Sequence, residues 1–273
     1  MTPRFDVYVI KIYNDFKCEK RLKNPSASRS LMFHQKKVII FDMDGTLIDS
    51  VGIWNAVDRE LIARLGGETL PEASLQQRRD ELLRTFSHAQ DAYLEYCAFL
   101  AQTYNATCSK EDIRAMRYAI AQHYLKEVID FKPDAHTLLH YLKEKGYLLV
   151  IASTTSQNNL NIYIHENDAM RQKVDFEKTF SLILGREVVS KIKPHPEVHQ
   201  FIMQKLGVEP HECLVVEDSL VGLEAAHNAG IEAITIFDAY AKKDEAELRK
   251  HSVGYFEDFE TLLLHVKEEL GKS

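Results

Sequence analysis

Residues 37–50 read KVIIFDMDGTLIDS, and this stretch indicates the fold of the chain. Residues 38–41 are apolar and rich in β-branched side chains, which is typical of a buried β-strand. The strand would deliver Asp42 and Asp44 to a loop that Gly45 can turn sharply. Two carboxylates so close together favour either separate acid and base roles or a metal site. An isolated calcium loop would also fit the Asp-x-Asp-Gly pattern.

Four further apolar runs follow along the chain. Residues 148–152, 213–216 and 233–237 are each followed by polar side chains, and a weaker run lies at residues 181–184. Helical periodicity separates these runs, and alternating strands and helices predict a parallel sheet. We therefore expect an α/β protein with a Rossmann-like parallel sheet and helices on both faces. Ligands of such sheets bind beyond the carboxyl ends of the strands, where the polar residues fall.

An insertion of about 80 residues, 50–130, separates the first two expected strands. It is too long for a single crossover helix. Apolar residues recur there every three or four positions, as at Ile113, Met116 and Ile120, which predicts an all-helical cap subdomain. The α/β core would then comprise residues 37–49 and 131–273.

Residues 1–36 are expected to form a flexible N-terminal extension, because a polar stretch that contains Pro25 precedes Met32. The net charge of residues 1–37 is +6, whereas the rest of the chain carries −13. The extension could be an upstream read-through before a natural start at Met32, a tail or a tether. We assign it no function.

Composition excludes several classes of protein. The 273 residues are 45% hydrophobic and 27% charged, as in ordinary globular proteins rather than collagenous or disordered ones. No stretch approaches the roughly 18 apolar residues of a membrane helix, and the N-terminus lacks the apolar core of a secretory signal. The four cysteines lack CxxC spacing, and the net charge of −7 does not favour nucleic acid. We therefore expect a cytoplasmic monomer or weak homo-oligomer with neither nucleic-acid nor membrane partners.

Two groups of residues are suited to binding phosphate. Ser153 and Thr154 follow an expected strand where a helix begins, and hydroxyls with free backbone N–H groups suit an anion there. Lys193 lies in the stretch 191–196, KIKPHP, whose two prolines would hold the loop and direct the ammonium toward the same site. Lys191 is the alternative lysine, but the proline spacing favours Lys193.

A second pair of acids, Glu217 and Asp218, ends another expected strand. Together with Asp42 they would bring oxygen ligands from two strand ends to one edge of the sheet. Mg²⁺ prefers such hard ligands, with phosphate oxygens and water completing its coordination. The sequence thus predicts a pocket for phosphate and magnesium.

These groups resemble the four motifs of the haloacid dehalogenase-like superfamily. Residues 42–47, DMDGTL, are similar to its Asp-x-Asp-Gly-Thr-Leu motif. The remaining motifs are matched by Ser153, by Lys193-Pro194-His195-Pro196, and by Glu217-Asp218-Ser219 with Gly222. The resemblance covers roughly residues 37–265. A helical cap in this place is similar to the subgroup of β-phosphoglucomutase, phosphoglycolate phosphatase and sugar-phosphate phosphatases.

The resemblance implies a phosphatase that hydrolyses a small phosphorylated metabolite, with a sugar phosphate as the best single guess. It implies that Asp42 attacks phosphorus and forms an aspartyl phosphate. Asp44 would protonate the leaving alkoxide and later activate water. Closure of the cap would exclude bulk water.

The resemblance also implies Mg²⁺ as cofactor. The metal would be held by the Asp42 side chain, the Asp44 backbone carbonyl and Asp218, with Glu217 either a direct ligand or one layer further out. The phosphoryl oxygens would be bound by Ser153, the Thr154 amide and Lys193.

Two other functions stay open. A phosphosugar mutase of the β-phosphoglucomutase type would use the same four motifs, but residues 78–86 lack the glycine-containing, arginine-bearing loop expected of such a mutase. A non-catalytic module that binds phosphate and Mg²⁺ is the third possibility, against which stands the presence of every motif residue. Asp44 argues against the haloacid dehalogenases proper, which lack an acid at that position.

Overall fold

The computed structural model describes residues 31–68, 70–86 and 91–271. Of the N-terminal extension expected at residues 1–36, residues 1–30 lie outside this range. Within residues 31–36, Met32 and Phe33 are buried, and their N–H groups donate to the Glu269 carboxylate at 3.1 and 2.7 Å. The described chain forms two compact units. The first comprises the described residues up to Ile48, Phe131–Asn161 and the residues from Arg171 onward, and the second comprises Asp49–Asp130 and Ile162–Met170.

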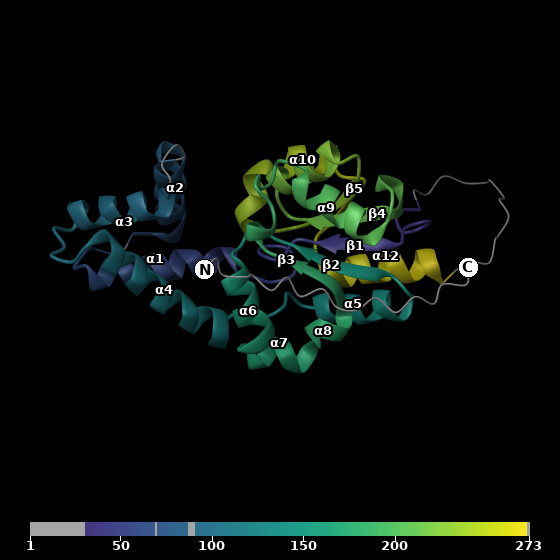
Figure 1. Ribbon diagram of the computed structural model, residues 1–273, viewed down its shortest axis with the longest axis horizontal. Coiled ribbons are helices and arrows are strands. Elements are labelled where there is room, and N and C mark those ends of the chain that lie inside the picture. Colours follow the sequence, from purple (N-terminus) through teal and green to yellow (C-terminus); the bar gives the residue numbers. More distant parts are fainter. Residues whose placement is uncertain (1–30, 69, 87–90, 272–273) are drawn as a thin grey trace, which may run out of the picture. The chain divides into compact units, whose positions relative to one another are not determined.

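A six-stranded sheet forms the centre of the first unit (Figure 1). Its strands are β1 (Val38–Phe41), β2 (Leu148–Ala152), β3 (Phe180–Leu184), β4 (Cys213–Glu217), β5 (Glu232–Ile236) and β6 (Gly254–Phe256). They lie in the order β3-β2-β1-β4-β5-β6, and all neighbours are parallel. The chain runs outward from β1 in both directions, so the topological switch point lies between β1 and β4. The sheet confirms the Rossmann-like α/β fold.

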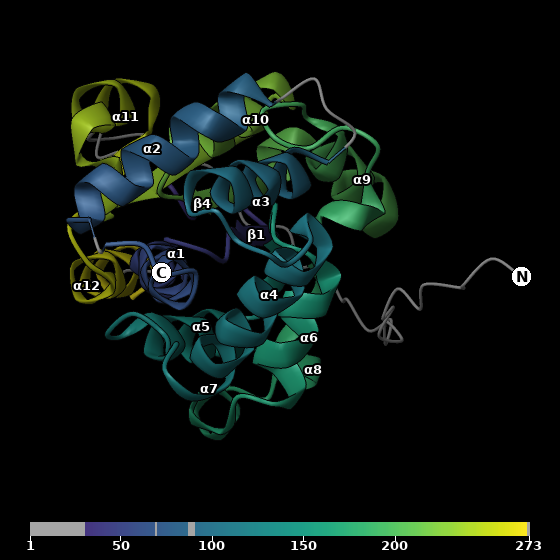
Figure 2. The same ribbon diagram turned by 90° about the vertical axis from the view of Figure 1, so that its left-hand side faces the viewer.

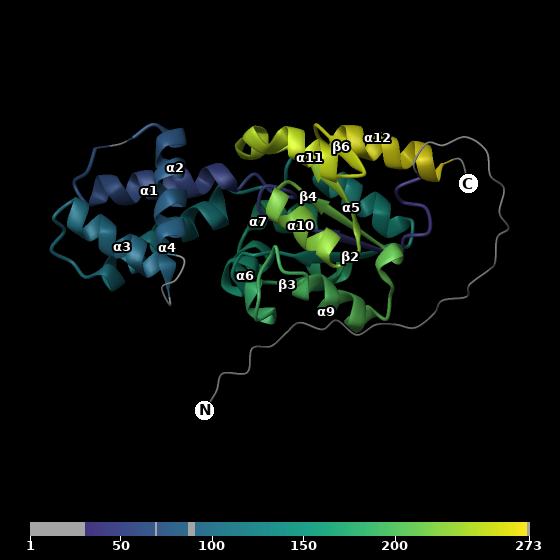
Figure 3. The same ribbon diagram turned by 90° about the horizontal axis from the view of Figure 1, so that it is seen from above.

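Helices cover both faces of this sheet (Figure 1, Figure 3). Those of the first unit are α5 (Ala135–Glu144), α8 (Phe176–Thr179), α9 (Glu197–Leu206), α10 (Leu220–Asn228), α11 (Glu245–His251) and α12 (Phe259–Leu270). Ile40 and Val150 point into the same apolar cluster as residues of α9, α10 and α11, whereas α5 and α12 pack together on the other side. All four residues of β1 are buried, and successive residues of a strand face opposite ways, so both faces of β1 are covered.

The connections add two helices and three short 3₁₀ turns. Helices α6 (Gln157–His165) and α7 (Asp168–Lys173) contain residues of both units. The 3₁₀ turns are η1 (Arg186–Val188), η2 (Pro210–Glu212) and η3 (Ala239–Asp244). Across the described residues, we find no helix with the length and apolar character that a membrane crossing requires.

In the part of the second unit that the structure describes, all the regular elements are helices (Figure 2). Its main helices are α1 (Val51–Arg64), α2 (Glu72–Thr85), α3 (Ala92–Thr103) and α4 (Lys110–Glu127). The apolar stripe expected from the sequence is its core, where Ile113 and Ile120 of α4 pack with Leu61 of α1. The side chain of Ser109 accepts the backbone N–H of Asp112 and starts α4 in a capping box.

Residues 162–170 belong to the helical unit although they lie far from the insertion at 50–130. Asn167 is fully buried, and its Nδ2 donates to the carbonyl oxygens of Leu125 at 2.8 Å and Ile129 at 2.7 Å. Leu125 lies in the last turn of α4 and Ile129 just beyond it, so the asparagine side chain supplies donors where the N–H groups of the helix end. Asn167 lies outside the insertion at residues 50–130, so the sequence did not predict this attachment.

Candidate active site

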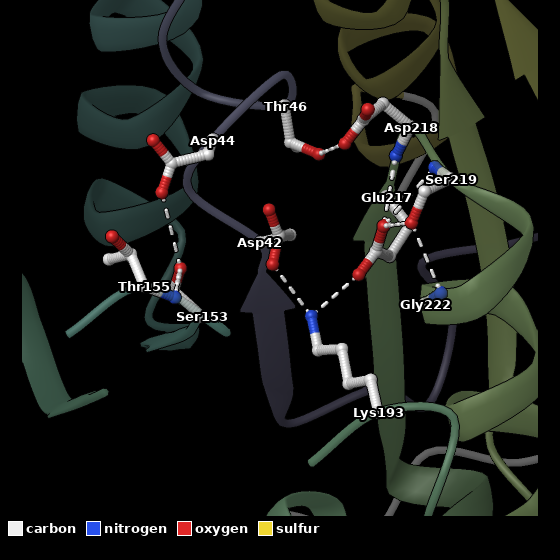
Figure 4. Close-up of polar contacts among 10 residues, drawn as sticks. All are labelled: Asp42, Asp44, Thr46, Ser153, Thr155, Lys193, Glu217, Asp218, Ser219 and Gly222. Carbon is white, nitrogen blue, oxygen red and sulfur yellow. Dashed lines mark hydrogen bonds and ion pairs between the residues drawn. The ribbon is translucent and has the colours of Figure 1, made fainter. Parts of the chain in front are cut away.

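Most of the predicted site residues lie at the carboxyl ends of β1, β2 and β4, beside the switch point, and Lys193 joins them from the loop between β3 and α9 (Figure 4). Asp42 directly follows β1, and its N–H donates to the carbonyl oxygen of Val216 in β4 at 3.0 Å. This bond extends the sheet by one residue and fixes the place where the Asp42 carboxylate emerges. Four separate segments, the ends of three strands and the loop that carries Lys193, contribute side chains to one edge of the sheet.

The loop after β1 is tightly bonded to itself. Gly45 has φ = 86°, a left-handed conformation that favours glycine, and its N–H donates to Ile48 O at 3.0 Å. The N–H of Ile48 in turn donates to Met43 O at 3.1 Å. Thr46, for which the sequence suggested no role, donates from Oγ1 to Asp218 Oδ1 at 2.7 Å. The loop is therefore attached to the end of β4.

A buried cluster of three acids and one lysine occupies the centre of the site. Ligand oxygens of Asp42, Glu217 and Asp218 all lie within 4.8 Å of one another. Lys193 Nζ donates to Asp42 Oδ1 at 2.7 Å and to Glu217 Oε1 at 2.6 Å (Figure 4). One ammonium faces three carboxylates, and this excess of negative charge among hard oxygen donors fits a divalent cation such as Mg²⁺.

The electrostatics of the cluster agree with that fit. Burial raises the pKa of Asp42 to about 7 against the opposing effect of Lys193, and the charges of Glu217 and Asp44 add to the rise. Burial, together with the charges of Glu217 and Asp42, also raises the pKa of Asp218 well above its usual range. Burial alone would lower the pKa of Lys193, but the charges of Asp42 and Glu217 raise it. A bound cation would favour the ionised carboxylates.

Both oxygens of Glu217 are engaged by the protein. Oε1 accepts from Lys193, whereas Oε2 accepts from Ser219 Oγ at 3.0 Å and from the backbone N–H of Asp218 at 3.2 Å. A Cβ placed on Gly222 would lie 1.8 Å from Glu217 Cδ, so only glycine leaves room for this carboxylate. Gly222 N–H donates to Ser219 Oγ at 3.1 Å, and Ser219 is the N-cap of α10.

Asp44 lies on the other side of Asp42, toward β2 (Figure 4). Ser153 Oγ donates to Asp44 Oδ2 at 3.4 Å, and the N–H of Thr155 donates to Ser153 Oγ at 3.1 Å. The carboxylate of Asp44 is thus separate from the three-acid cluster. Thr154 has an exposed side chain, and it is Thr155 whose backbone contacts Ser153.

The structure distinguishes the two candidate lysines. Lys193 is buried in the cluster, whereas the side chain of Lys191 is exposed. The N–H of Lys191 and the N–H of Ser190 donate to the Glu197 carboxylate at 3.0 and 2.8 Å. These bonds anchor the loop that precedes Lys193.

Two residues near the site went unrecognised in the sequence. The Lys132 ammonium donates to the carbonyl oxygens of Gly45 and Phe237 and to Asp238 Oδ2. Asp238 lies just beyond the end of β5, after Phe237. Its one available signal was that it is a polar residue after a predicted strand. Lys132 lies where the chain returns from the insertion, and nothing in the local pattern indicated where its side chain would reach.

Comparison with known proteins finds relatives that are named phosphatases and a solved structure with a similar fold. Hexitol phosphatase B of Escherichia coli K12 is 28% identical over 205 residues, which cover 75% of this chain and 85% of that protein. Phosphoglycolate phosphatase of Pasteurella multocida is 26% identical over 211 residues, which cover 76% and 88%. The crystal structure of CbbY from Rhodobacter sphaeroides in complex with phosphate has a TM-score of 0.63 and 24% identity, covering 82% of this chain and 95% of that one.

The family model for haloacid dehalogenase-like hydrolases matches residues 39–236. This range begins in β1 and ends with β5. It includes the four acids of the site, Asp42, Asp44, Glu217 and Asp218. The resemblance seen in the motifs is thereby confirmed, and the chain belongs to the haloacid dehalogenase-like hydrolase family.

Proposed function

We propose that the protein is a Mg²⁺-dependent phosphomonoester hydrolase that acts on a small phosphorylated metabolite through an aspartyl-phosphate intermediate, with sugar phosphates as the first substrates to test. The observation that carries this proposal is the Asp42 carboxylate at the end of β1, surrounded by Lys193, Glu217 and Asp218. The enzyme class predicted from the sequence, a haloacid dehalogenase-like phosphatase, is confirmed by the family match and by relatives named hexitol phosphatase and phosphoglycolate phosphatase.

Asp42 is the proposed nucleophile. A carboxylate oxygen forms a bond to phosphorus while the bond from phosphorus to the ester oxygen breaks, and the leaving oxygen takes the bonding electron pair. Lys193 holds one oxygen of Asp42 at 2.7 Å, which fixes the carboxylate for in-line attack. Dividing the displacement into two steps leaves a phosphoryl group on Asp42 for water to remove.

Asp44 is the proposed acid and base. It gives a proton to the leaving alkoxide and then takes one from water as the water oxygen bonds to phosphorus and the bond between phosphorus and Asp42 breaks. This step releases inorganic phosphate and regenerates the Asp42 carboxylate. Its position supports this assignment, because Asp44 lies next to Ser153, on the side of Asp42 away from Glu217 and Asp218 (Figure 4). A carboxylate outside the cation site remains available for proton transfer.

Asp42, Asp218 and the backbone carbonyl of Asp44 would hold Mg²⁺, which when bound neutralises charge on the phosphoryl oxygens. Both oxygens of Glu217 are already engaged, which supports a place for Glu217 outside the direct ligands. We assign the binding of the phosphoryl oxygens to Ser153, the Thr154 amide and Lys193. The cytoplasmic location, the oligomeric state and the division into core and cap stay predictions.

Phosphate release from hexitol phosphates, sugar phosphates, phosphoglycolate and nucleotides tests the proposal, with Mg²⁺ and with EDTA. We expect Mg²⁺-dependent release in the wild type and a loss of at least ~10³-fold in Asp42→Asn, because the amide is not a nucleophile. Asp175→Asn is the matched control, since it makes the same chemical change at the N-cap of α8, where asparagine also caps.

Failure of every substrate to release phosphate above the Asp42→Asn background would contradict hydrolysis. A coupled assay for glucose 6-phosphate formed from β-glucose 1-phosphate would then test the mutase alternative. Binding of phosphate and Mg²⁺ without turnover in either assay would favour the non-catalytic module.

A further inference from the structure

Lys132 is a nearly buried lysine whose three donors all have acceptors. Its side chain is 13% exposed, and Nζ donates to Phe237 O at 3.0 Å, to Asp238 Oδ2 at 3.0 Å and to Gly45 O. Asp238 is buried as well, with 3% of its side chain exposed. Because this ammonium is little exposed and all three of its N–H groups have acceptors, it fixes the positions of the groups that it contacts.

The partners of Lys132 lie in the loops after two strands that are not neighbours in the sheet. Gly45 belongs to the loop that follows β1, whereas Phe237 and Asp238 follow β5, and β4 lies between these two strands. Lys132 therefore connects the segments on either side of the carboxyl end of β4, where Asp218 lies. Its own N–H also donates to Leu47 O at 2.9 Å, so backbone and side chain hold the same loop.

The held peptide leads directly to the acidic cluster. The carbonyl of Gly45 shares a peptide unit with the N–H of Thr46, whose Oγ1 donates to Asp218 Oδ1 at 2.7 Å. The residue before Gly45 is Asp44, whose carbonyl is one of the proposed Mg²⁺ ligands. Asp238 also acts on the cluster, since its charge contributes to the raised pKa of Asp218. Lys132 thus orients the loop and pairs with Asp238, whose charge acts on Asp218.

We propose that Lys132, paired with Asp238, is a positioning residue that keeps the Asp44 carbonyl and the Asp218 carboxylate at the spacing that Mg²⁺ binding requires. The inference rests on the proposed function, because it concerns the same site. Lys132 touches none of the three clustered carboxylates, so its effect passes through the Gly45 peptide and Thr46. Residues that orient metal ligands typically contribute 10- to 100-fold to metal affinity or activity, by order of magnitude.

The experiment compares Lys132→Met with the double variant Lys132→Met/Asp238→Asn. Methionine keeps the apolar stem but no donor, and the second substitution removes the buried carboxylate that the first leaves unpaired. Mg²⁺ binding is measured by isothermal titration calorimetry, kcat and KM by phosphate release, and folding by thermal melting. If Lys132→Met alone does not fold, the double variant carries the same measurements.

Lys36→Met is the matched control. Lys36 has a side chain that is 4% exposed, and its Nζ donates to His211 O at 3.0 Å and to Glu232 Oε2 at 2.7 Å. It resembles Lys132 in bonding one carboxylate and a backbone carbonyl, but it lies before β1, at the opposite end of the sheet. Loss of Lys36 should lower the melting temperature and leave Mg²⁺ affinity and kcat unchanged.

We expect the Mg²⁺ dissociation constant to rise by about 10-fold and kcat to fall by about 10-fold in both Lys132 variants, with KM changed by less than about 3-fold. Folded variants that bind Mg²⁺ as tightly as the wild type would overturn the inference alone, as would recovery of wild-type affinity and kcat in the double variant. A wild type that neither binds Mg²⁺ nor releases phosphate would overturn the proposed function and this inference with it.

Discussion

Asp42 shows at the scale of one residue how a folded chain can prepare a place for a cation. The nearest positive charge, Lys193, is shared with Glu217, while Asp218 adds a third carboxylate. Burial removes the water that would otherwise solvate these charges, so a proton binds Asp42 at a pH where an exposed aspartate is ionised. The same site should therefore exchange protons for metal.

We predict that Mg²⁺ stabilises the protein more at about pH 8 than at about pH 5.5. The pKa of Asp42 rises from 3.8 to about 7 on folding, so between these values the folded protein binds a proton that the unfolded chain lacks. The contribution of Asp42 to stability is therefore present below pH 3.8 and is lost as pH rises through about 7. Mg²⁺ competes with that proton, and its stabilising effect should grow as pH rises.

The measurement is the difference in melting temperature between Mg²⁺ and EDTA, taken at both pH values. Because each difference is taken at a single pH, the titration of groups remote from the site largely cancels. Asp42→Asn should reduce both the difference and its growth with pH. A Mg²⁺ effect that is equal at the two pH values in the wild type would contradict the prediction.

At the scale of elements, the turn from β4 into α10 combines a helix cap with the acidic cluster. Ser219 caps α10 by accepting the N–H of Gly222, and the same hydroxyl donates to Glu217. The N-cap of the helix therefore positions the Glu217 carboxylate, which in turn accepts a hydrogen bond from Lys193. The helix can approach Glu217 this closely because position 222 carries no side chain.

We predict that Gly222→Ala lowers kcat by at least about 10-fold, because the added methyl would lie 1.8 Å from Glu217 Cδ and must displace that carboxylate. Phosphate release and thermal melting check this expectation. Val221→Ala is the control, since Val221 is 47% exposed in the same turn of α10 and should leave kcat unchanged. Equal activity in the two variants would show that Glu217 can move without consequence.

At the scale of the whole molecule, the chain builds two units with different kinds of core. The first is organised by a parallel sheet, whereas the helical unit combines an apolar core with a buried group of ion pairs. Asp58 of α1 accepts from Arg79 of α2 at 3.0 Å and from Arg117 of α4 at 2.7 Å. Arg117 also lies 5.0 Å from the ring centroid of Trp54 and 5.2 Å from that of Tyr93. One carboxylate thus connects three helices.

We predict that Asp58→Asn destabilises the helical unit by about 3 kcal/mol or more, since it leaves two buried guanidinium groups without their shared carboxylate. Hydrogen exchange should show lost protection within residues 49–130 and 162–170 and unchanged protection in β1 to β5. Glu60→Gln, which removes an exposed ion pair with Arg64 on the same helix, should change little. Equal loss of protection in the sheet would contradict this prediction.

The sequence by itself determined the class of fold and the identity of the acids. A strand buried on both faces must be apolar throughout, so its end is visible as the first polar residue, as at Asp42 and Glu217. Parallel strands place such ends on one edge of the sheet, which is why residues about 175 positions apart could be assigned to one site. The proline spacing similarly indicated Lys193 rather than Lys191, and Lys193 is the lysine found among the acids.

Only the tertiary structure decided which groups meet across the sheet. The contacts of Lys132 with Gly45 and Asp238 depend on the order β1-β4-β5, and no local periodicity encodes strand order. The attachment of Asn167 to the end of α4 likewise follows from packing between distant segments. Local patterns report whether a residue is buried and in which element, whereas a long polar side chain finds its partners only once the elements are assembled.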